Sequence, residues 1–300
     1  MTETRTKKSS LLPVLITMLM ITSAVAVGVR MTTPGEDKLQ AMQEEWQTLT
    51  AEKEALTGEI QGLKAAVAEQ KDLPQAIQRQ KEEGFRQLGE LEQKIKAGES
   101  TQKIAYLTFD DGPYDNTTEA ILDVLKEKGV HATFFLRHRP DHVAQIRREI
   151  REGHTLANHS YSHKIKAVYQ SADSCIREIR DQQEWLTETV GVTPQIYRFP
   201  GGSPTAGSKK QAIAAALAAD GLGYVDWNCA TGDGLPGALT TEKAYQNAIG
   251  SVGEQKIVVM LMHDYSTATL EALPEIIDTL KAEGYLLMPL FRESVMIRSA

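Results

Sequence analysis

IAYLTFDDGP, residues 104–113, is the stretch that decides the fold, because a run of apolar side chains ends there at two adjacent carboxylates. An apolar run of this length predicts a strand buried inside a sheet. Asp110 and Asp111 would then stand at the C-terminal end of that strand. Active sites of parallel α/β folds form at this end of the sheet. The segment therefore predicts both a fold class and the position of a catalytic site.

Outward from this segment, apolar runs alternate with amphipathic stretches from Lys103 onward. This alternation predicts parallel strands, in either a closed barrel or an open doubly wound sheet. Strands are predicted over Ile104–Phe109, Ala132–Leu136, Thr155–Asn158, Ile196–Phe199, Gly223–Asn228, Ile257–Met262 and Tyr285–Leu290. Helices are predicted over Thr117–Lys128, Asp141–Glu152, Ser171–Val190, Lys209–Asp220, Thr241–Ile249 and Thr269–Glu283.

Polar residues also follow other predicted strands, at Arg198, at Asp226 to Asp233 and at His263-Asp264. His159 and His163 have the spacing of four that, on a helical turn, places two imidazoles on one face. Two histidines and a carboxylate leave coordination positions open, as a catalytic metal site requires. Each pattern alone has an ordinary explanation as a turn or as solvated histidines. Their combination at strand ends favours a catalytic metal site.

Four motifs in this order make the chain similar to the NodB-homology polysaccharide deacetylases, a family of metal-dependent carbohydrate esterases. They are TFDDGP at 108–113, HSYSH at 159–163, RFPGG at 198–202 and LMHD at 261–264. The resemblance spans about Lys103 to Leu290. It implies a distorted (β/α) barrel of about seven parallel strands.

The resemblance also implies a role for each matching residue. Asp110 would be the general base, paired with Arg198, and His263 would be the general acid, oriented by Asp233. A backbone N–H near Gly201 would help to form the oxyanion hole, and Trp227 would pack beside the groove. The implied cofactor is a divalent metal, zinc first, with cobalt, nickel or manganese as alternatives. Its ligands would be Asp111, His159 and His163.

The fourth motif departs from the family pattern, because Ala230 and Gly234 replace an aspartate and a tryptophan. Asp233 is retained, and it would orient His263 and stabilise the charged form of its imidazole. The departure therefore predicts an altered groove wall and a changed substrate preference more than a changed chemical step.

The N-terminal residues predict a single-pass membrane protein. Basic residues in the tail 1–10 precede the apolar run Leu11–Val29, which is long enough to cross a bilayer. The basic flank predicts a cytoplasmic tail and an extracytoplasmic catalytic domain at the cell membrane. A signal peptide cleaved after Ala26 is the alternative.

Residues 36–98 predict a coiled-coil stalk between this anchor and the catalytic domain, which is expected over 103–300. The seam is formed by Leu39, Met42, Trp46, Leu49, Lys53, Leu56, Ile60, Leu63 and Val67. Such a heptad array predicts a homodimer. A single amphipathic helix that lies against the catalytic domain or a partner is the alternative.

Composition and motifs together limit the function. A formal net charge of -7 argues against nucleic acid as a partner. We expect a metal-dependent hydrolase that removes N-acetyl groups from a cell-wall or related N-acetylglucosamine polysaccharide. One alternative is an O-deacetylase of xylan or another acetylated glycan. The other is a non-catalytic, membrane-tethered glycan-binding or scaffolding protein.

Overall fold

The computed structural model describes residues 44–58, 61, 84–294 and 297–299. The chain divides into two compact units, Met1–Ala76 and Ile77–Ala300. The predicted anchor Leu11–Val29 lies outside the described residues. Within the described part of the chain, no helix combines the length and the apolar character needed to cross a membrane.

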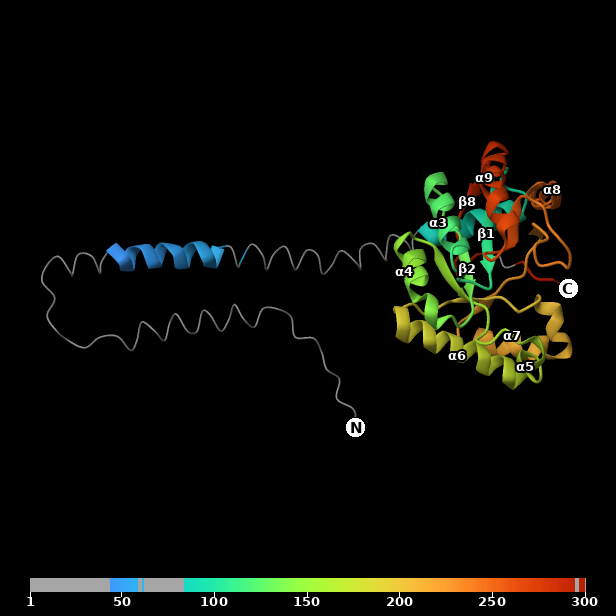
Figure 1. Cartoon of the computed structure of the whole chain (residues 1–300), viewed down its shortest axis with the longest axis horizontal. Helices are drawn as coiled ribbons and strands as arrows, with labels where there is room; N and C mark the ends of the chain where they lie inside the picture. Colours follow the sequence, from blue (N-terminus) through green and yellow to red (C-terminus); the bar gives the residue numbers. More distant parts are fainter. Residues whose placement is uncertain (1–43, 59–60, 62–83, 295–296, 300) are drawn as a thin grey trace, which may run out of the picture. The chain divides into compact units, whose positions relative to one another are not determined.

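In the first unit, residues 44–58 form a helix, drawn in blue in Figure 1. Trp46, Leu49 and Leu56 belong to the predicted coiled-coil seam, and all three are exposed on this helix. Exposed apolar side chains at this spacing are what a helix needs in order to pair with another. Residues 62–83 of the predicted stalk lie outside the described part, so the homodimer stays a prediction.

The second unit is built on one parallel sheet, which has eight strands among the described residues. Seven of them follow the order β5-β4-β3-β2-β1-β7-β6, and β8 pairs with β1. This topology confirms the predicted parallel α/β organisation. The strands are β1 (Lys103–Asp110), β2 (Thr133–Leu136), β3 (Thr155–Asn158), β4 (Ile196–Tyr197), β5 (Gly223–Tyr224), β6 (Cys229–Ala230), β7 (Ile257–His263) and β8 (Tyr285–Leu287).

Strand β1 lies inside the sheet because it is paired along both edges. β7 pairs with residues 104–110, whereas β2 pairs with residues 108–110 and β8 with residues 103–105. The register sets Asp110 opposite His263 of β7. Two residues that are 153 positions apart in sequence are therefore neighbours at the same end of the sheet.

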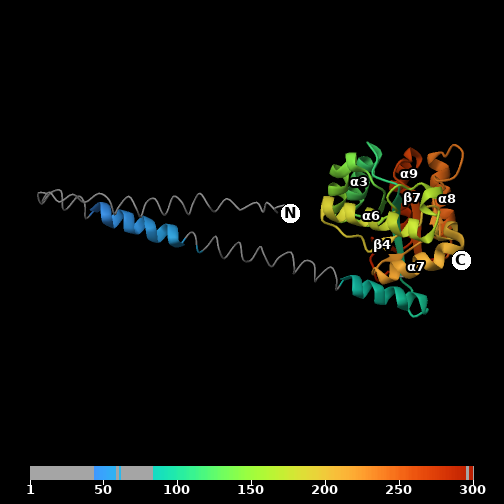
Figure 2. The same cartoon turned by 90° about the horizontal axis from the view of Figure 1, so that it is seen from below.

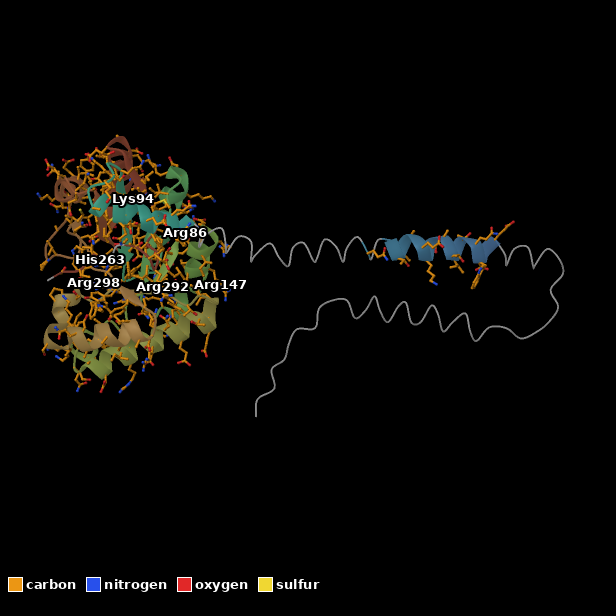
Figure 3. The ribbon with its side chains drawn as sticks, turned by 180° about the vertical axis from the view of Figure 1, so that it is seen from behind. Arg86, Lys94, Arg147, His263, Arg292 and Arg298 are labelled. Carbon is orange, nitrogen blue, oxygen red and sulfur yellow. The ribbon has the colours of Figure 1, made fainter. Side chains whose placement is uncertain are left out.

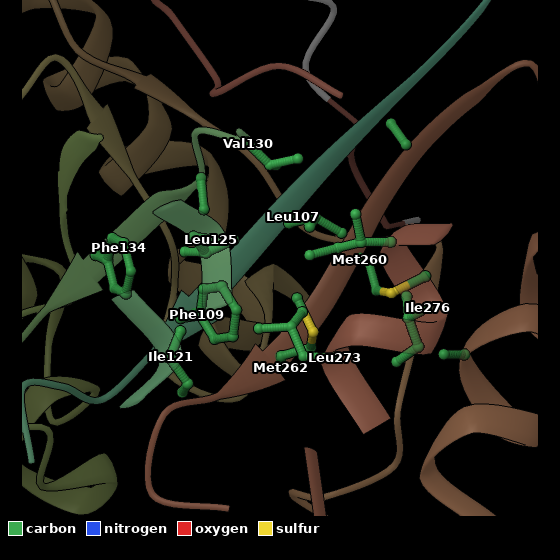
Figure 4. Packing of buried hydrophobic residues seen from close by; sticks show 14 of the residues in the cluster. Leu107, Phe109, Ile121, Leu125, Val130, Phe134, Met260, Met262, Leu273 and Ile276 are labelled. Atoms are coloured by element: carbon green, nitrogen blue, oxygen red, sulfur yellow. The ribbon is translucent and has the colours of Figure 1, made fainter. Parts of the chain in front are cut away.

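Helices connect the strands and pack on the sheet (Figure 1). A hydrophobic cluster joins β1 and β7 to α3 and α9, with Leu107 and Met260 among the strand residues and Ile121 and Leu273 among the helix residues (Figure 4). The bounds are α3 (Thr117–Lys128), α4 (Val143–Arg151), α5 (Ile165–Val168), α6 (Ala172–Val190), α7 (Lys210–Ala219), α8 (Thr241–Val252) and α9 (Thr267–Ala282), with 3-10 turns at Pro140–His142 and Ser203–Lys209.

A second cluster takes alternate residues of β1, such as Ile104 and Tyr106, because successive side chains of a strand point to opposite faces. Leu88 and Ile95 join it from a helix over residues 84–96, drawn in teal in Figure 2. Glu92 of this helix is fully buried and accepts a hydrogen bond from the Tyr106 hydroxyl. The sequence placed residues 84–96 in the stalk, whereas they contribute to the core of the second unit.

The barrel is open, since the strand path ends at β5 and β6 and no pair joins these two strands among the described residues. β4 and β5 also end earlier than predicted, at Tyr197 and Tyr224. Arg198 explains the early end of β5, because its guanidinium donates to the carbonyl oxygens of Val225 and Asp226 at 3.3 and 3.1 Å. The Arg198 side chain thus occupies two backbone carbonyl oxygens to which a neighbouring strand would otherwise donate hydrogen bonds.

Candidate active site

The predicted site residues come together at the C-terminal ends of the strands. Asp110 ends β1, His263 ends β7 and His159 directly follows β3; His263 is labelled in Figure 3. Every predicted site residue except Arg198 lines one pocket of about 540 Å³. These lining residues are Asp110, Asp111, His159, His163, Gly201, Trp227, Asp233 and His263.

Asp111, His159 and His163 form a group that fits a metal ion, since one ligand atom from each lies within 4.8 Å of the others. The Asp111 Oδ1 atom is buried and has no hydrogen-bond partner among the described residues. It lies 3.3 Å from Nε2 of His163. A buried carboxylate oxygen normally requires a partner, so this unsatisfied atom, together with two imidazoles, favours a cation site.

The hydrogen bond that His159 makes determines which ring nitrogen is free. Its Nδ1 lies 2.9 Å from the carbonyl oxygen of Arg198. A carbonyl can only accept, so Nδ1 carries the hydrogen and Nε2 keeps its lone pair. Burial, reinforced by the nearby His163, lowers the pKa of His159 to about 3. The ring is therefore neutral at physiological pH, which is the state that binds a metal.

The two histidines do not lie on a helical turn, so this part of the sequence prediction was wrong. Residues 159–164 form a bend between β3 and α5. Ser160 and His163 have φ angles of 69° and 55°, in the left-handed region. The Ser160 hydroxyl accepts the backbone N–H of His163 at 3.1 Å. The tight bend, rather than helical periodicity, brings the two rings to 4.8 Å between centroids.

Asp110 is buried and is paired with a fully buried Arg198, whose Nη1 lies 2.8 Å from Asp110 Oδ1. The same Nη1 donates to Oγ1 of Thr108 at 2.7 Å. Burial raises the pKa of Asp110, and the charge of Arg198 opposes this rise. Asp110 Oδ2 lies 3.6 Å from Nε2 of His159. One oxygen of Asp110 is thus held by the arginine, while the other lies beside the candidate metal ligands.

His263 is paired with Asp233, whose Oδ1 lies 2.8 Å from Nδ1 of the imidazole. Burial alone would lower the pKa of His263, but the Asp233 hydrogen bond and the charges of Asp110 and Asp233 outweigh it, so the pKa is raised. Oδ2 of Asp233 accepts the Thr269 hydroxyl at 2.6 Å. The pair therefore favours the protonated imidazole.

The loop after β4 contains the predicted oxyanion donor. Gly201 and Gly202 have φ angles of 74° and 85°, which favour glycine. A Cβ on Gly202 would lie 3.1 Å from the Trp227 ring. Ser203 is held by Asp226, whose carboxylate accepts its backbone N–H at 2.7 Å and its hydroxyl at 2.6 Å. The loop is therefore packed by an aromatic ring and tied by a buried carboxylate.

Gly234 lies against the imidazole of His263. A Cβ at this position would be 2.8 Å from Cε1 and 3.5 Å from both ring nitrogens. Tyr265 also stacks on this imidazole, with centroids 5.0 Å apart. The imidazole of His263 is thus packed between Gly234 and Tyr265, and position 234 has no room for a side chain in this arrangement.

Sequence reasoning missed three supporting residues. Thr108 and Thr269 hold Arg198 and Asp233 through hydroxyl groups. Thr108 is the first residue of the TFDDGP motif but had been given no role, and nothing local in the sequence marks Thr269. Asp226 could have been found, because it follows a predicted strand as the other site residues do. Asp233, which the resemblance gives as the residue that orients His263, lies within hydrogen-bond distance of its imidazole.

Comparisons with known proteins find relatives of this chain among polysaccharide deacetylases. Residues 97–220 match the family described as Polysaccharide deacetylase. The peptidoglycan-N-acetylglucosamine deacetylase of Bacillus cereus is 30% identical over 193 residues, which cover 61% of this chain and 68% of that protein. A chitin deacetylase of Colletotrichum lindemuthianum is 34% identical over 197 residues, which cover 60% and 74%. Over the first relatives matched, the chain spans 65% to 69% of their length.

A solved structure is also similar. It is the catalytic domain of a peptidoglycan N-acetylglucosamine deacetylase from Eubacterium rectale, with a TM-score of 0.63 and 36% identity. The match covers 66% of this chain and 93% of that one. The similarity therefore extends to nearly the whole of a catalytic domain.

Proposed function

We propose that this chain, which belongs to the polysaccharide deacetylase family, removes N-acetyl groups from an N-acetylglucosamine polymer of the cell wall or a related glycan. The proposal rests mainly on how two residue pairs lie beside the candidate metal ligands. Asp110, which is paired with Arg198, and His263, which is paired with Asp233, line the same pocket as those ligands. The ligands are Asp111, His159 and His163. The proposed base, the proposed acid and the candidate cation site thus surround the same pocket.

Asp111, His159 and His163 would hold a divalent cation, and we propose zinc. A divalent cation bound there supplies Lewis-acid chemistry, polarising a carbonyl and lowering the pKa of a water. The neutral imidazole of His159 and the unsatisfied oxygen of Asp111 are the observations that support this ligand set.

Asp110 would take the proton of the attacking water. Arg198 favours the ionised carboxylate by charge and fixes the Oδ1 atom. The other oxygen, Oδ2, is the one free to accept a proton. A backbone N–H of the loop at Gly201 would donate to the developing oxyanion, a contribution worth about 3 kcal/mol in comparable acyl chemistry.

His263 would donate a proton to the leaving amine. Since Nδ1 is engaged with Asp233, Nε2 is the atom that can give up its proton. Acetate and a free amino sugar would be the products. The relatives named for peptidoglycan N-acetylglucosamine and for chitin support an N-acetylglucosamine substrate, because both glycans contain that sugar.

The test is acetate release from N-acetylglucosamine oligomers, peptidoglycan and acetylated xylan, with wild type and Asp110→Asn side by side. We expect wild-type release from the N-acetylglucosamine substrates and at least a hundredfold loss in the variant. Release from xylan alone would replace the substrate with an O-acetylated glycan. Equal release by both proteins would refute the assignment of Asp110 as the catalytic base.

We further propose that the enzyme is anchored in the cell membrane by Leu11–Val29, with the catalytic unit outside, and that the heptad array Leu39–Val67 pairs two copies. The apolar run and the heptad seam support these proposals. Recovery of mature protein that starts after Ala26 would contradict the anchor. Sedimentation of the soluble protein as a monomer at high concentration would contradict the pairing.

A further inference from the structure

An arginine lies beside the candidate metal ligands. Nε of Arg137 is 3.7 Å from Oδ1 of Asp111, the buried oxygen that has no hydrogen-bond partner among the described residues. At this distance the two side chains form an ion pair but not a hydrogen bond. Oδ1 therefore keeps its lone pairs for a cation, although its negative charge already has a positive neighbour.

The sheet fixes the position of Arg137. This residue directly follows β2, and its backbone N–H donates to the carbonyl oxygen of Gly112 at 3.4 Å. The backbone N–H of Asp111 in turn donates to the carbonyl oxygen of Phe135 at 3.1 Å. These hydrogen bonds extend the pairing of β1 and β2 past the strand ends. Backbone contacts thus hold the arginine next to Asp111, and only 23% of its side chain is exposed.

Three carboxylates line the described part of the pocket, and each has a cationic partner. Asp110 pairs with Arg198 at 2.8 Å. Asp233 pairs at 2.8 Å with His263, which is positively charged when protonated. Arg137 is the corresponding partner of the third carboxylate, which is a candidate metal ligand. The pocket therefore offers a divalent cation suitable ligand atoms but little net negative charge.

Arg139 provides a comparison within the same segment. Its guanidinium lies over the ring of Tyr114, 4.3 Å from the ring centroid. An aromatic face attracts a cation without any carboxylate. Arg139 thus carries the same charge as Arg137 but packs on an aromatic ring, whereas Arg137 adjoins a metal-ligand oxygen. The position of Arg137 is therefore the feature that bears on metal binding.

We propose that Arg137 limits the affinity of the cation site, because its positive charge opposes a divalent ion bound there and compensates Asp111 when the ion is absent. A carboxylate or carbonyl behind a metal ligand strengthens metal binding, whereas a cation in that position acts in the opposite direction. The inference rests on the proposed cation site, but not on the deacetylation proposed for it. Occupancy of the site would then follow the concentration of free metal around the protein.

The experiment measures the Kd for Zn²⁺ of the whole chain, freed of metal, by competition with a coloured zinc chelator. Arg137→Met removes the charge, whereas Arg137→Lys keeps it, and Arg139→Met removes a charge that packs on an aromatic ring instead. We expect Arg137→Met to bind Zn²⁺ about tenfold more tightly than wild type. The other two variants should bind it as wild type does. His159→Ala/His163→Ala measures zinc held elsewhere on the protein, which is subtracted.

Salt separates an effect of charge from an effect of altered packing. The screening length falls from roughly 30 Å at about 0.01 M salt to roughly 3 Å at about 1 M, and Arg137 is partly exposed. The ratio of the Kd of wild type to that of Arg137→Met should therefore shrink toward one as salt rises. A repacked site would keep its ratio. If Arg137→Met loses the circular dichroism of wild type, Arg137→Gln takes its place as the neutral variant.

Equal or weaker zinc binding by Arg137→Met would overturn the inference, as would a Kd ratio that salt does not change. If wild type binds no more zinc than the double histidine variant, the inference fails together with the proposed cation site. Failure of the proposed function is a separate outcome. Zinc binding as expected, without release of acetate from any glycan, would contradict the deacetylase and support the role of Arg137.

Discussion

Asp233 holds His263 through two different atoms of the histidine, because Oδ1 accepts the imidazole Nδ1–H at 2.8 Å and Oδ2 accepts the backbone N–H at 2.8 Å. The carboxylate thus ties the ring to the strand end from which it projects. Neither the tilt of the ring nor its tautomer can change without breaking a charge-assisted hydrogen bond. Asp233 therefore fixes the position of the imidazole and contributes to its raised pKa.

Asp233→Asn should shift the alkaline limb of the pH profile to lower pH. The acid must be protonated to act, and the carboxylate raises the pKa of His263. Activity is lost as pH rises through that raised pKa, so a lower pKa brings the loss to lower pH. The measurement is kcat/KM from pH 6 to pH 10, with Thr269→Val as a milder change at the same carboxylate. An alkaline limb at an unchanged pH would contradict the role of Asp233.

Removal of both imidazoles should abolish metal binding, whereas removal of the base should not. We expect His159→Ala/His163→Ala to lose its divalent metal and Asp110→Asn to keep it, since only the first change removes ligands. Elemental analysis of the purified proteins gives the metal content, and circular dichroism controls for folding. Equal metal content in wild type and the double variant would exclude this site.

Gly234→Ala should reduce kcat rather than alter substrate preference. The added Cβ would lie 2.8 Å from Cε1 of His263, so the ring must move. A displacement of about 1 Å in a catalytic group costs roughly a hundredfold in rate. Gly89→Ala is the matched control, because the contacts of its Cβ start at an ordinary 3.5 Å. A changed ratio of rates between two glycans at an unchanged kcat would instead support the original expectation of an altered groove wall.

Asp226→Ala should lower kcat while leaving metal content unchanged. Its carboxylate fixes Ser203 of the oxyanion loop and also accepts the backbone N–H of Ser299 at 2.8 Å. The C-terminal segment and the loop thus share one anchor. Deletion of residues 297–300 should have a smaller effect in the same direction, because Ser203 keeps both of its hydrogen bonds to the Asp226 carboxylate. Full activity of Asp226→Ala would show that the loop holds its shape without the carboxylate.

Glu149→Met should stabilise the fold, and more so at high pH. Glu149 is fully buried on α4, and neither carboxylate oxygen has a hydrogen-bond partner among the described residues. Burial, together with the nearby Asp264, raises its pKa well above the usual value. A carboxyl group with a raised folded-state pKa favours folding below its unfolded pKa and loses that benefit as pH rises.

Replacing the buried carboxyl group should raise the free energy of unfolding by about 2 kcal/mol. This corresponds to a rise of roughly 5 °C in the melting temperature of a domain of this size. Thermal denaturation at pH 5 and pH 8 measures the effect. Glu149→Gln is the comparison, because it removes the ionisation but keeps a polar group. A gain that is the same at both pH values would contradict a titrating Glu149.

Local motifs explain why so much of the site could be predicted. Asp110 and His263 each end a strongly apolar strand, so their placement at the sheet edge follows from the pattern alone. The conformation of the His159 to His163 bend could not be predicted, because its positive φ angles depend on contacts with Arg198 and Asn158. Strand β6, which is only two residues long, lacks any periodicity of its own.

The assignment of residues 84–96 shows another limit of periodicity. Leu88 and Ile95 are seven residues apart, the spacing of a coiled-coil seam, yet they pack against the sheet. An apolar stripe on a helix has the same spacing whichever surface covers it. Only buried Glu92, an unusual residue for a seam, points to a partner other than a second helix.

That helix also lies at the end of the sheet opposite the pocket. Leu88 and Ile95 pack with Ile104 and Ile257, near the first residues of β1 and β7, whereas the pocket lies at the last residues of the same strands. Tension applied through the preceding chain would reach the base of the sheet first and would be shared by a packed core. The catalytic rim would stay oriented away from the point where the preceding chain enters this unit.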